Sequence, residues 1–276
     1  MPFVSDGRTL IQRAFEGNYA LPSFNICSLE MAKACIEAAE QERAPIMLQT
    51  YPGDLEHGSP KVMTSMIRAL ADEVSVPIML HLDHGPDLET ATRCLRAGYS
   101  SVMFDGEEFP LEKNIHLTDQ LASFAHAAGA SLEAAAGSFG GGEGGDDEIH
   151  LTEPDDAARL YKEGHADMIA VSVGSKHGQA SQLDLARLAS IAKAVQGPLV
   201  LHGGTGIPAS DLAEAVTYGV VKVNIGAGLQ RAVMGVWKDK TASAACHYDV
   251  YHAARDALRE VAKDKIHMTH AAGRAD

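Results

Sequence analysis

Short apolar runs alternate with longer amphipathic stretches over almost the whole chain, and this alternation constrains the fold more than any other feature. Several runs are continuously apolar, which is the pattern of parallel strands buried on both faces. The predicted strands are Tyr19–Ile26, Pro45–Thr50, Pro77–Leu82, Ser100–Phe104, Ser131–Ala134, Asp167–Val173, Pro198–Leu201 and Val220–Ile225. The predicted helices between and after them are Leu29–Arg43, Pro60–Val74, Asp87–Ala97, Leu111–Ala128, Pro154–Glu163, Leu183–Val195, Pro208–Tyr218 and Ala227–Lys238.

Eight strand–helix units in one chain of 276 residues predict a (β/α)8 TIM barrel, an α/β fold. An open doubly wound sheet is the alternative, but the count of eight favours closure. A further helix over Asp249–Lys263, followed by a tail, predicts a C-terminal helical extension. No linker or low-complexity segment divides the chain, so we expect residues 1–276 to form a single domain.

The charge and the apolar runs of the sequence disfavour nucleic-acid and membrane binding, and the cysteines indicate the compartment. The chain carries 37 acidic and 23 basic residues, a net charge of −14, and no basic stripe that would bind nucleic acid or an anionic membrane. No apolar run approaches the roughly 18 residues of a membrane span, and the first residues carry no signal-peptide pattern. The four cysteines lack CxxC spacing, which is typical of reduced thiols. We therefore expect a cytoplasmic protein.

Polar side chains follow or end six of the predicted strands. In a TIM barrel the active site lies at the carboxyl ends of the strands, so these side chains should converge on one face. The residues concerned are Asp83 and His84, Asp105, Glu133, His177, His202 and Asn224.

Three of these residues are histidines, and each is followed directly by glycine: His84, His177 and His202. Three imidazoles leave a fourth position open on Zn²⁺, as a catalytic metal requires. The sequence therefore predicts a metal site at these three positions. His81 lies one strand period before Asp83, and we interpret it as a core or supporting residue rather than a ligand.

The ordered motifs resemble the class II, metal-dependent fructose-bisphosphate and tagatose-bisphosphate aldolases. The most specific motif is VPIMLHLDHG at residues 76–85. The others are LPSFN at 21–25, SVMFDG at 101–106, GGGE at 140–143, VGSKHG at 173–178, LHGGTG at 201–206, VKVNI at 221–225 and AAGRAD at 271–276.

The resemblance implies a set of roles. His84, His177 and His202 would bind one zinc ion, with Asp105 and Glu133 as a possible second metal site. Asp83 would act as acid/base on the substrate hydroxyl, and Glu143 would move a proton at the enediolate carbon. Homodimers or homotetramers are usual in this family. The implied substrate-binding residues are Asn25, Gly178, Gly203, Gly204, Thr205, Asn224, Ile225, Gly226 and Ala227.

Four departures from the family pattern lie on the substrate side. Tyr51 replaces a serine near a substrate phosphate, Ala135 replaces a glutamate, and Gly226–Ala227 stand where the family has a phosphate-binding threonine. The segment after His177 is shorter than in the family. Backbone N–H groups could still hold a phosphate, and we interpret the changes as altered substrate choice.

The leading hypothesis is a zinc-dependent aldolase that cleaves a ketose phosphate, a ketose bisphosphate or a related ketose. One alternative is a metal-dependent isomerase or epimerase, because an enediolate can be reprotonated elsewhere. Another is a non-catalytic sugar-phosphate-binding relative, although Asp83 and Glu143 would be unnecessary for binding alone. A Schiff-base mechanism on Lys176 or Lys222 is a minor alternative. The glycine-rich segment Gly137–Gly145 is expected to close over bound substrate.

Overall fold

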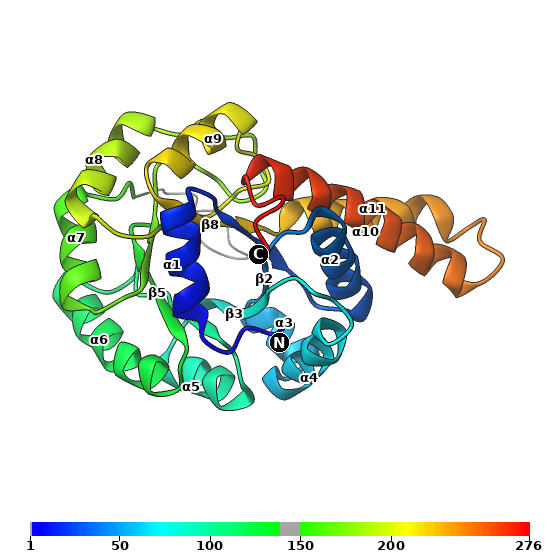
Figure 1. The fold of residues 1–276 in the computed structure, drawn as a ribbon, viewed down its shortest axis with the longest axis horizontal. Helices are drawn as coiled ribbons and strands as arrows, with labels where there is room; N and C mark the ends of the chain where they lie inside the picture. The colour runs from blue at the N-terminus through cyan, green and yellow to red at the C-terminus, as the bar shows by residue number, and fades with distance from the viewer. Residues whose placement is uncertain (1, 139–149) are drawn as a thin grey trace.

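The computed structural model describes residues 2–138 and 150–276, and in it eight parallel strands close into a barrel. Each strand pairs with its neighbour in the chain, and β8 pairs with β1. The predicted TIM barrel is therefore confirmed (Figure 1). The strands are β1 Leu21–Asn25, β2 Ile46–Thr50, β3 Ile78–Gly85, β4 Ser101–Phe104, β5 Ser131–Ala136, β6 Met168–Val171, β7 Leu199–Leu201 and β8 Val220–Ile225.

Helices surround the barrel, and eight of those described begin and end within three residues of the predicted bounds, while the C-terminal helix is longer than predicted. Two helices were not predicted, α1 and α3. The helices are α1 Gly7–Gly17, α2 Leu29–Glu42, α3 Pro52–His57, α4 Pro60–Ala71, α5 Leu88–Ala97, α6 Leu111–Ala127, α7 Pro154–Glu163, α8 Leu185–Val195, α9 Ala209–Thr217, α10 Ala227–Lys240 and α11 His247–Met268. None of the described helices is long and apolar enough to cross a membrane.

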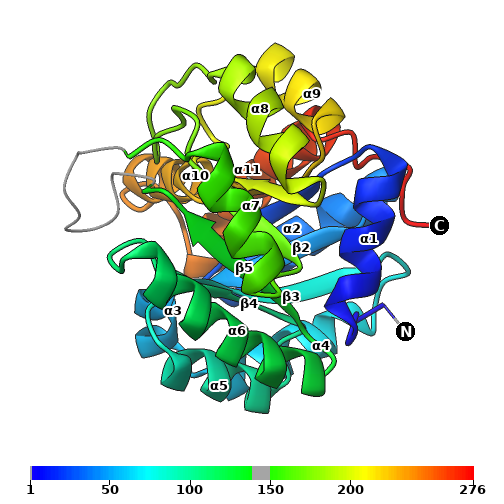
Figure 2. The ribbon, with the colours of Figure 1, turned by 90° about the vertical axis from the view of Figure 1, so that its left-hand side faces the viewer.

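Helix α1 covers the end of the barrel at which the strands begin (Figures 1 and 2). Asp6 caps the helix by accepting a hydrogen bond from the backbone N–H of Arg8, and α1 buries one apolar face. Gly7 lies so close to β4 that an added Cβ would be 2.2 Å from the carbonyl oxygen of Ser100. With this end closed, the loops that follow the strands form the open face.

The C-terminal extension is longer than predicted and is joined tightly to the barrel. Helix α10 and helix α11 lie side by side and project beyond the barrel (Figure 1). Asp249 stabilises the start of α11 by accepting hydrogen bonds from the backbone N–H groups of Ala245 and Cys246. The tail is also ordered, since Ala271 is wholly buried and the N–H of Gly273 donates to the carbonyl of Glu42.

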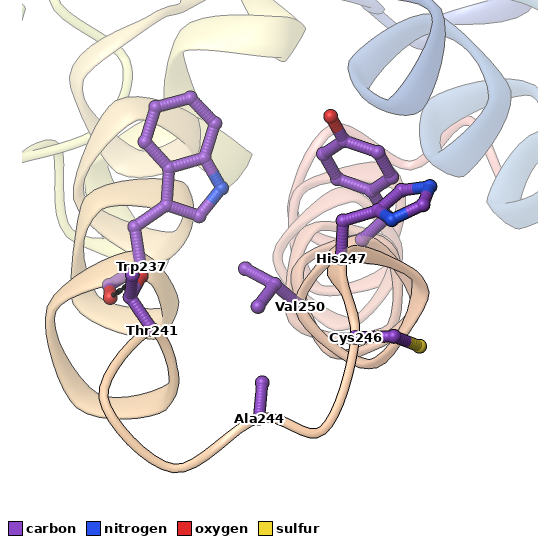
Figure 3. A pocket seen from close by; sticks show the side chains of 7 residues that line it. Trp237, Thr241, Ala244, Cys246, His247 and Val250 are labelled. Atoms are coloured by element: carbon purple, nitrogen blue, oxygen red, sulfur yellow. Dashed lines mark hydrogen bonds between the residues drawn. The ribbon is translucent and has the colours of Figure 1, made fainter.

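The tip of this extension contains a pocket of about 380 Å³ (Figure 3). It is lined by Trp237, Thr241, Ala244, Cys246, His247, Val250 and Tyr251. Several large apolar side chains of α10 and α11 are exposed around it, among them Met234 and Tyr248.

Gly7→Ala should destabilise the protein, because the new methyl group would overlap the carbonyl of Ser100 and the side chain of Met79. Overpacking of this kind costs about 1–3 kcal/mol. The matched control is Gly235→Ala inside α10, where an added Cβ meets no heavy atom within 4 Å among the described residues. Helix propensity predicts a gain of about 0.5–1 kcal/mol there. Urea unfolding midpoints measure the effects of both substitutions. A change of the same sign in the two variants would contradict the close contact at Gly7.

Candidate functional site

Three histidines meet at the open face of the barrel: His84 in β3, His177 in the loop after β6, and His202 directly after β7. One ring nitrogen each of His84, His177 and His202 lies within 4.8 Å of the others. The ring centroids are 4.7 Å apart for His84 and His202, and 5.6 and 5.9 Å for the two pairs that include His177. Within residues 2–138 and 150–276, no other group of three or more His, Cys, Asp or Glu side chains is arranged to hold a metal ion.

An irregularity at the end of β3 aims His84 into this cluster. The register between β3 and β4 shifts between Leu82 and Gly85, and His84 has a φ of 50°. A bulge of this kind turns a side chain out of the regular alternation of a strand. A residue other than glycine in the left-handed region is uncommon and is often found at functional sites.

Two carboxylates determine which nitrogen atoms of the cluster can bind a metal. Asp105 Oδ2 lies 2.5 Å from His84 Nδ1, and Glu133 Oε1 lies 3.0 Å from His202 Nε2. Because an ionised carboxylate only accepts hydrogen bonds, these contacts assign the ring protons to His84 Nδ1 and His202 Nε2. The other two nitrogens, His84 Nε2 and His202 Nδ1, face each other at 3.1 Å, so both lone pairs become available to a metal ion once His84 has lost its second proton.

This donor set fits a divalent metal ion. Neutral imidazoles whose second nitrogen donates to a carboxylate are typical ligands of borderline cations such as Zn²⁺. Burial opposes charge on His84, but Asp83 and Asp105 outweigh it and raise the pKa of His84 to about 9. Burial lowers the pKa of His202 to about 4. The side of the cluster near the two aspartates therefore attracts positive charge most strongly.

Asp83 lies beside the cluster within a shell of amide groups. Its Oδ2 accepts hydrogen bonds from Asn25 at 3.0 Å and Gln49 at 2.8 Å, and its Oδ1 accepts one from Asn224 at 2.8 Å. Burial disfavours the charged carboxylate, but the charges of His84, His202 and Lys222 outweigh this effect and lower its pKa well below the usual range. Asp83 is therefore ionised and fixed in orientation.

Gln49 is a member of this shell that the sequence analysis missed. It is wholly buried in β2 and also donates to Asn25 Oδ1 at 2.8 Å, while Ser23 donates to its carbonyl oxygen. The available signal was one amide inside the otherwise apolar strand IMLQT. Such a buried polar group needs partners, and here it finds them at Asp83.

Glu133 and Lys222 form a buried ion pair beneath the histidines. Lys222 Nζ lies 2.8 Å from Glu133 Oε2, and both side chains are wholly buried. Burial opposes ionisation of Glu133, but Lys222 and the histidine contacts outweigh it and lower its pKa well below the usual range. His81 is also buried, with Nδ1 2.8 Å from Ser101 Oγ and Nε2 3.3 Å from Glu133 Oε2. Lys222 is thus shielded from substrate, which disfavours the Schiff-base alternative at this residue.

The predicted substrate-side residues surround the start of α10. An added Cβ at Gly178, whose φ is +69°, would lie 3.2 Å from the Cβ of Ala227. The Thr205 hydroxyl accepts a hydrogen bond from the N–H of Gly228 at 3.1 Å, so it joins its loop to the first turn of α10. Arg231, which the sequence analysis did not select, donates to the carbonyl of Gly178 at 3.0 Å.

Gly203, Gly204 and Ile225 lie near the ends of β7 and β8 and are held by backbone contacts or buried. Gly203 has a φ of +72°, and its added Cβ would be 2.8 Å from the carbonyl oxygen of Lys176, so only glycine fits there. Gly204 donates its N–H to the carbonyl of Asn224 at 2.9 Å, while Ile225 is buried at the end of β8. Glu143 and most of the glycine-rich segment, including its expected closure, lie outside the described residues.

The family model described as "Fructose-bisphosphate aldolase class-II" matches residues 5–274. The chain belongs to the class II fructose-bisphosphate aldolase family. This confirms the resemblance seen in the sequence, and it makes the protein a class II aldolase, a metal-dependent aldehyde-lyase whose family acts on sugar phosphates.

Similar proteins carry different substrate names. This chain is 37% identical over 250 residues to a 6-phospho-5-dehydro-2-deoxy-D-gluconate aldolase of Bacillus licheniformis. The alignment covers 88% of this chain and 84% of that protein. It is 32% identical over 281 residues to a fructose-bisphosphate aldolase of Geobacillus stearothermophilus, covering 97% of each. The crystal structure of the YdjI aldolase from Escherichia coli K12 superposes with a TM-score of 0.87 at 30% identity, covering 98% of each chain.

Asp105→Asn should weaken metal binding without removing a ligand. The amide can present N–H to His84 Nδ1 instead of a lone pair, so the ring loses its fixed orientation and tautomer. Supporting carboxylates of this kind are worth about 10- to 100-fold in metal affinity. Titration of the metal-free protein against a chelating dye measures the change. An unchanged affinity would show that Asp105 does not orient His84.

Proposed function

We propose that this class II aldolase is a zinc enzyme that reversibly cleaves a ketose phosphate, with one ion held by His84, His177 and His202. The observation that carries the proposal is the pair of imidazole nitrogens that face each other at 3.1 Å while Asp105 and Glu133 accept the protons on the opposite sides of the rings. When bound, the divalent ion supplies Lewis-acid stabilisation of negative charge on the ketose carbonyl oxygen.

Asp83 is the proposed acid/base. Cleavage of the carbon–carbon bond of a ketol requires removal of a proton from the hydroxyl group next to that bond, and an ionised carboxylate is suited to take it. The amides of Asn25, Gln49 and Asn224 hold the two Asp83 oxygens in place. In the synthetic direction Asp83 returns the proton to the new hydroxyl.

Glu143 is proposed to transfer the proton at the enediolate carbon. This role comes from the family resemblance of the GGGE motif alone, since the residue lies outside the described part of the chain. A group on a loop can close over the substrate once it is bound and exclude water from the reactive intermediate.

The anionic end of the substrate is proposed to bind at the start of α10. Backbone N–H groups of Gly226 and Ala227 lie at a helix N-terminus, which favours anions. The exposed guanidinium of Arg231 is held nearby through its hydrogen bond to Gly178. These groups favour a phosphorylated ketose, although the threonine hydroxyl of the family is missing.

The decisive experiment combines metal analysis with a panel of ketose 1-phosphates, ketose bisphosphates and unphosphorylated ketoses. We expect about one zinc per chain and release of an aldehyde from a phosphorylated ketose. Full activity in a chelated, metal-free preparation would contradict the proposal. Conversion of the ketose to an isomer without aldehyde release would favour the isomerase or epimerase instead.

Asp83→Ala should keep the metal and lower kcat by about 10²- to 10⁴-fold, which is the usual contribution of a positioned acid/base. Its carboxylate contacts amides rather than the facing nitrogens of the cluster. Steady-state kinetics and metal content are measured on the same preparation. Loss of metal together with an unchanged rate per bound ion would instead assign Asp83 to orienting the ligands.

Ala227→Thr should increase the preference for phosphorylated over unphosphorylated ketose. A restored hydroxyl would add one hydrogen bond to the anion, worth about 1.5–3 kcal/mol or roughly 10- to 150-fold in kcat/KM. Ala227→Val is the matched control, since it adds the same bulk without the hydroxyl. Equal ratios in the two variants would place the phosphate elsewhere.

The family resemblance and the cysteines support a proposal for the assembly and the location of the protein. We propose a homodimer or homotetramer, to be tested by sedimentation velocity. The four cysteines form no disulfide, which is typical of a cytoplasmic protein. Localisation of a tagged chain tests this expectation.

A further inference from the structure

Lys222 has no assigned role in the proposed reaction beyond its effect on the pKa of Asp83, although it lies at the centre of the site. Its side chain is wholly buried in β8, and its Nζ donates to Glu133 Oε2 at 2.8 Å. Among the described residues, Glu133 is the one carboxylate within 4.0 Å of this ammonium group. The pair joins β8 to β5 across the barrel interior, because these strands are not neighbours in the sheet.

Glu133 divides its two oxygens between different partners. Oε2 accepts the hydrogen bond from Lys222, while Oε1 lies 3.0 Å from Nε2 of His202. The opposite nitrogen of the same ring, Nδ1, lies 3.1 Å from His84 Nε2 inside the histidine cluster. A carboxylate oxygen at Nε2 therefore keeps the ring proton there and leaves the Nδ1 lone pair directed at the cluster.

We propose that Lys222 is a positioning residue for the metal site. By holding Oε2, it fixes the rotation of the Glu133 carboxylate, and Glu133 in turn fixes the ring orientation and tautomer of His202. The inference rests on the proposed metal site, and it adds a residue that touches neither the metal nor the substrate.

The alternative is a purely structural role for the ion pair. A measured loss of stability cannot distinguish this role from the positioning role, because both predict it. Lys222→Met would leave Glu133 buried without its cation and would destabilise the barrel under either interpretation. A change at Glu133 does separate them, because a glutamine side chain has one acceptor and one donor end.

In Glu133→Gln, Lys222 selects which end faces the histidine. The ammonium group can only donate, so the amide oxygen must face Lys222 and the amide NH₂ must face His202 Nε2. The ring proton then moves to Nδ1, and the ligand lone pair is lost. When Lys222→Met is added, the oxygen can turn toward His202, and the NH₂ can face His81 Nε2, which lies 3.3 Å from the Oε2 position.

The experiment is a double-mutant cycle on zinc affinity, measured by competition with a chelating dye. We expect Glu133→Gln to weaken zinc binding about 10- to 100-fold. Lys222→Met should weaken binding about 10-fold in the natural background, and it should strengthen binding about 10-fold in the Glu133→Gln background. Nitrogen-15 NMR of the metal-free proteins reports the tautomer of His202. The proton is expected on Nε2 in the natural protein, on Nδ1 in Glu133→Gln, and again on Nε2 in the double variant.

Val221→Ala is the control for a general loss of stability. It truncates a wholly buried side chain of the same strand and leaves Lys222 and Glu133 in place. It should lower the Tm and leave zinc affinity unchanged.

The sign of the Lys222→Met effect decides the inference. Weaker zinc binding in both backgrounds, or unchanged affinity with a lower Tm, would overturn it and leave Lys222 a structural partner of Glu133. Glu133→Gln leaves the buried ammonium group without its carboxylate, so the folding of each variant is checked by circular dichroism before the zinc titration. If Lys222→Met alone does not fold, the comparison of Glu133→Gln with the double variant still decides, because neither contains an unpaired buried carboxylate at position 133. Failure of the proposed function is distinguishable, since the natural protein would then bind no zinc at the cluster.

Discussion

The wholly buried carboxylate of Glu133 is the group around which the interior of the site is arranged. A buried charge is expensive unless it is paired and hydrogen-bonded, and removal of one partner from such a pair typically costs about 3–5 kcal/mol. Its partners Lys222, His202 and His81 lie in β8, directly after β7, and in β3. Since Glu133 itself lies in β5, one carboxylate ties four strands together, and closure of the barrel is what brings those strands within reach of it.

The two buried acids of the site are both ionised, but different groups hold their oxygens. Asp83 is held by amide N–H donors and lies next to the histidine cluster, where a reacting hydroxyl could approach. Glu133 is neutralised by an ammonium group and supports a histidine from behind. Amides orient a carboxylate without giving it a proton, which suits an acid/base. An ion pair anchors a carboxylate in place, which suits a support.

The positions on the substrate side match the expected family residues less closely than the positions in the interior of the site. Relatives of 32 and 37% identity carry different substrate names, so overall similarity does not select the sugar. Tyr51, Gly226 and Ala227, where the sequence departs from the expected family pattern, lie directly after β2 or at the start of α10. A barrel tolerates such changes because its stability resides in the strands and helices, and function resides in the residues placed on them.

Most of the architecture could be predicted from sequence because it is local. Continuous apolar runs identify buried parallel strands. Because parallel strands end at the same face of a closed barrel, the sequence alone groups the histidines, Asp83 and Asn224. Helix α1 was missed, although Asp6 before Gly7 and the apolar face of Leu10, Ile11 and Ala14 were available as a signal.

The sequence thus determined the barrel, the family and the chemical character of the site. Only the tertiary structure decided which groups hold those residues, such as Gln49 against Asp83 and Lys222 against Glu133. These partners are 34 and 89 positions apart in the chain, and no local pattern records a contact that exists only when the barrel is closed.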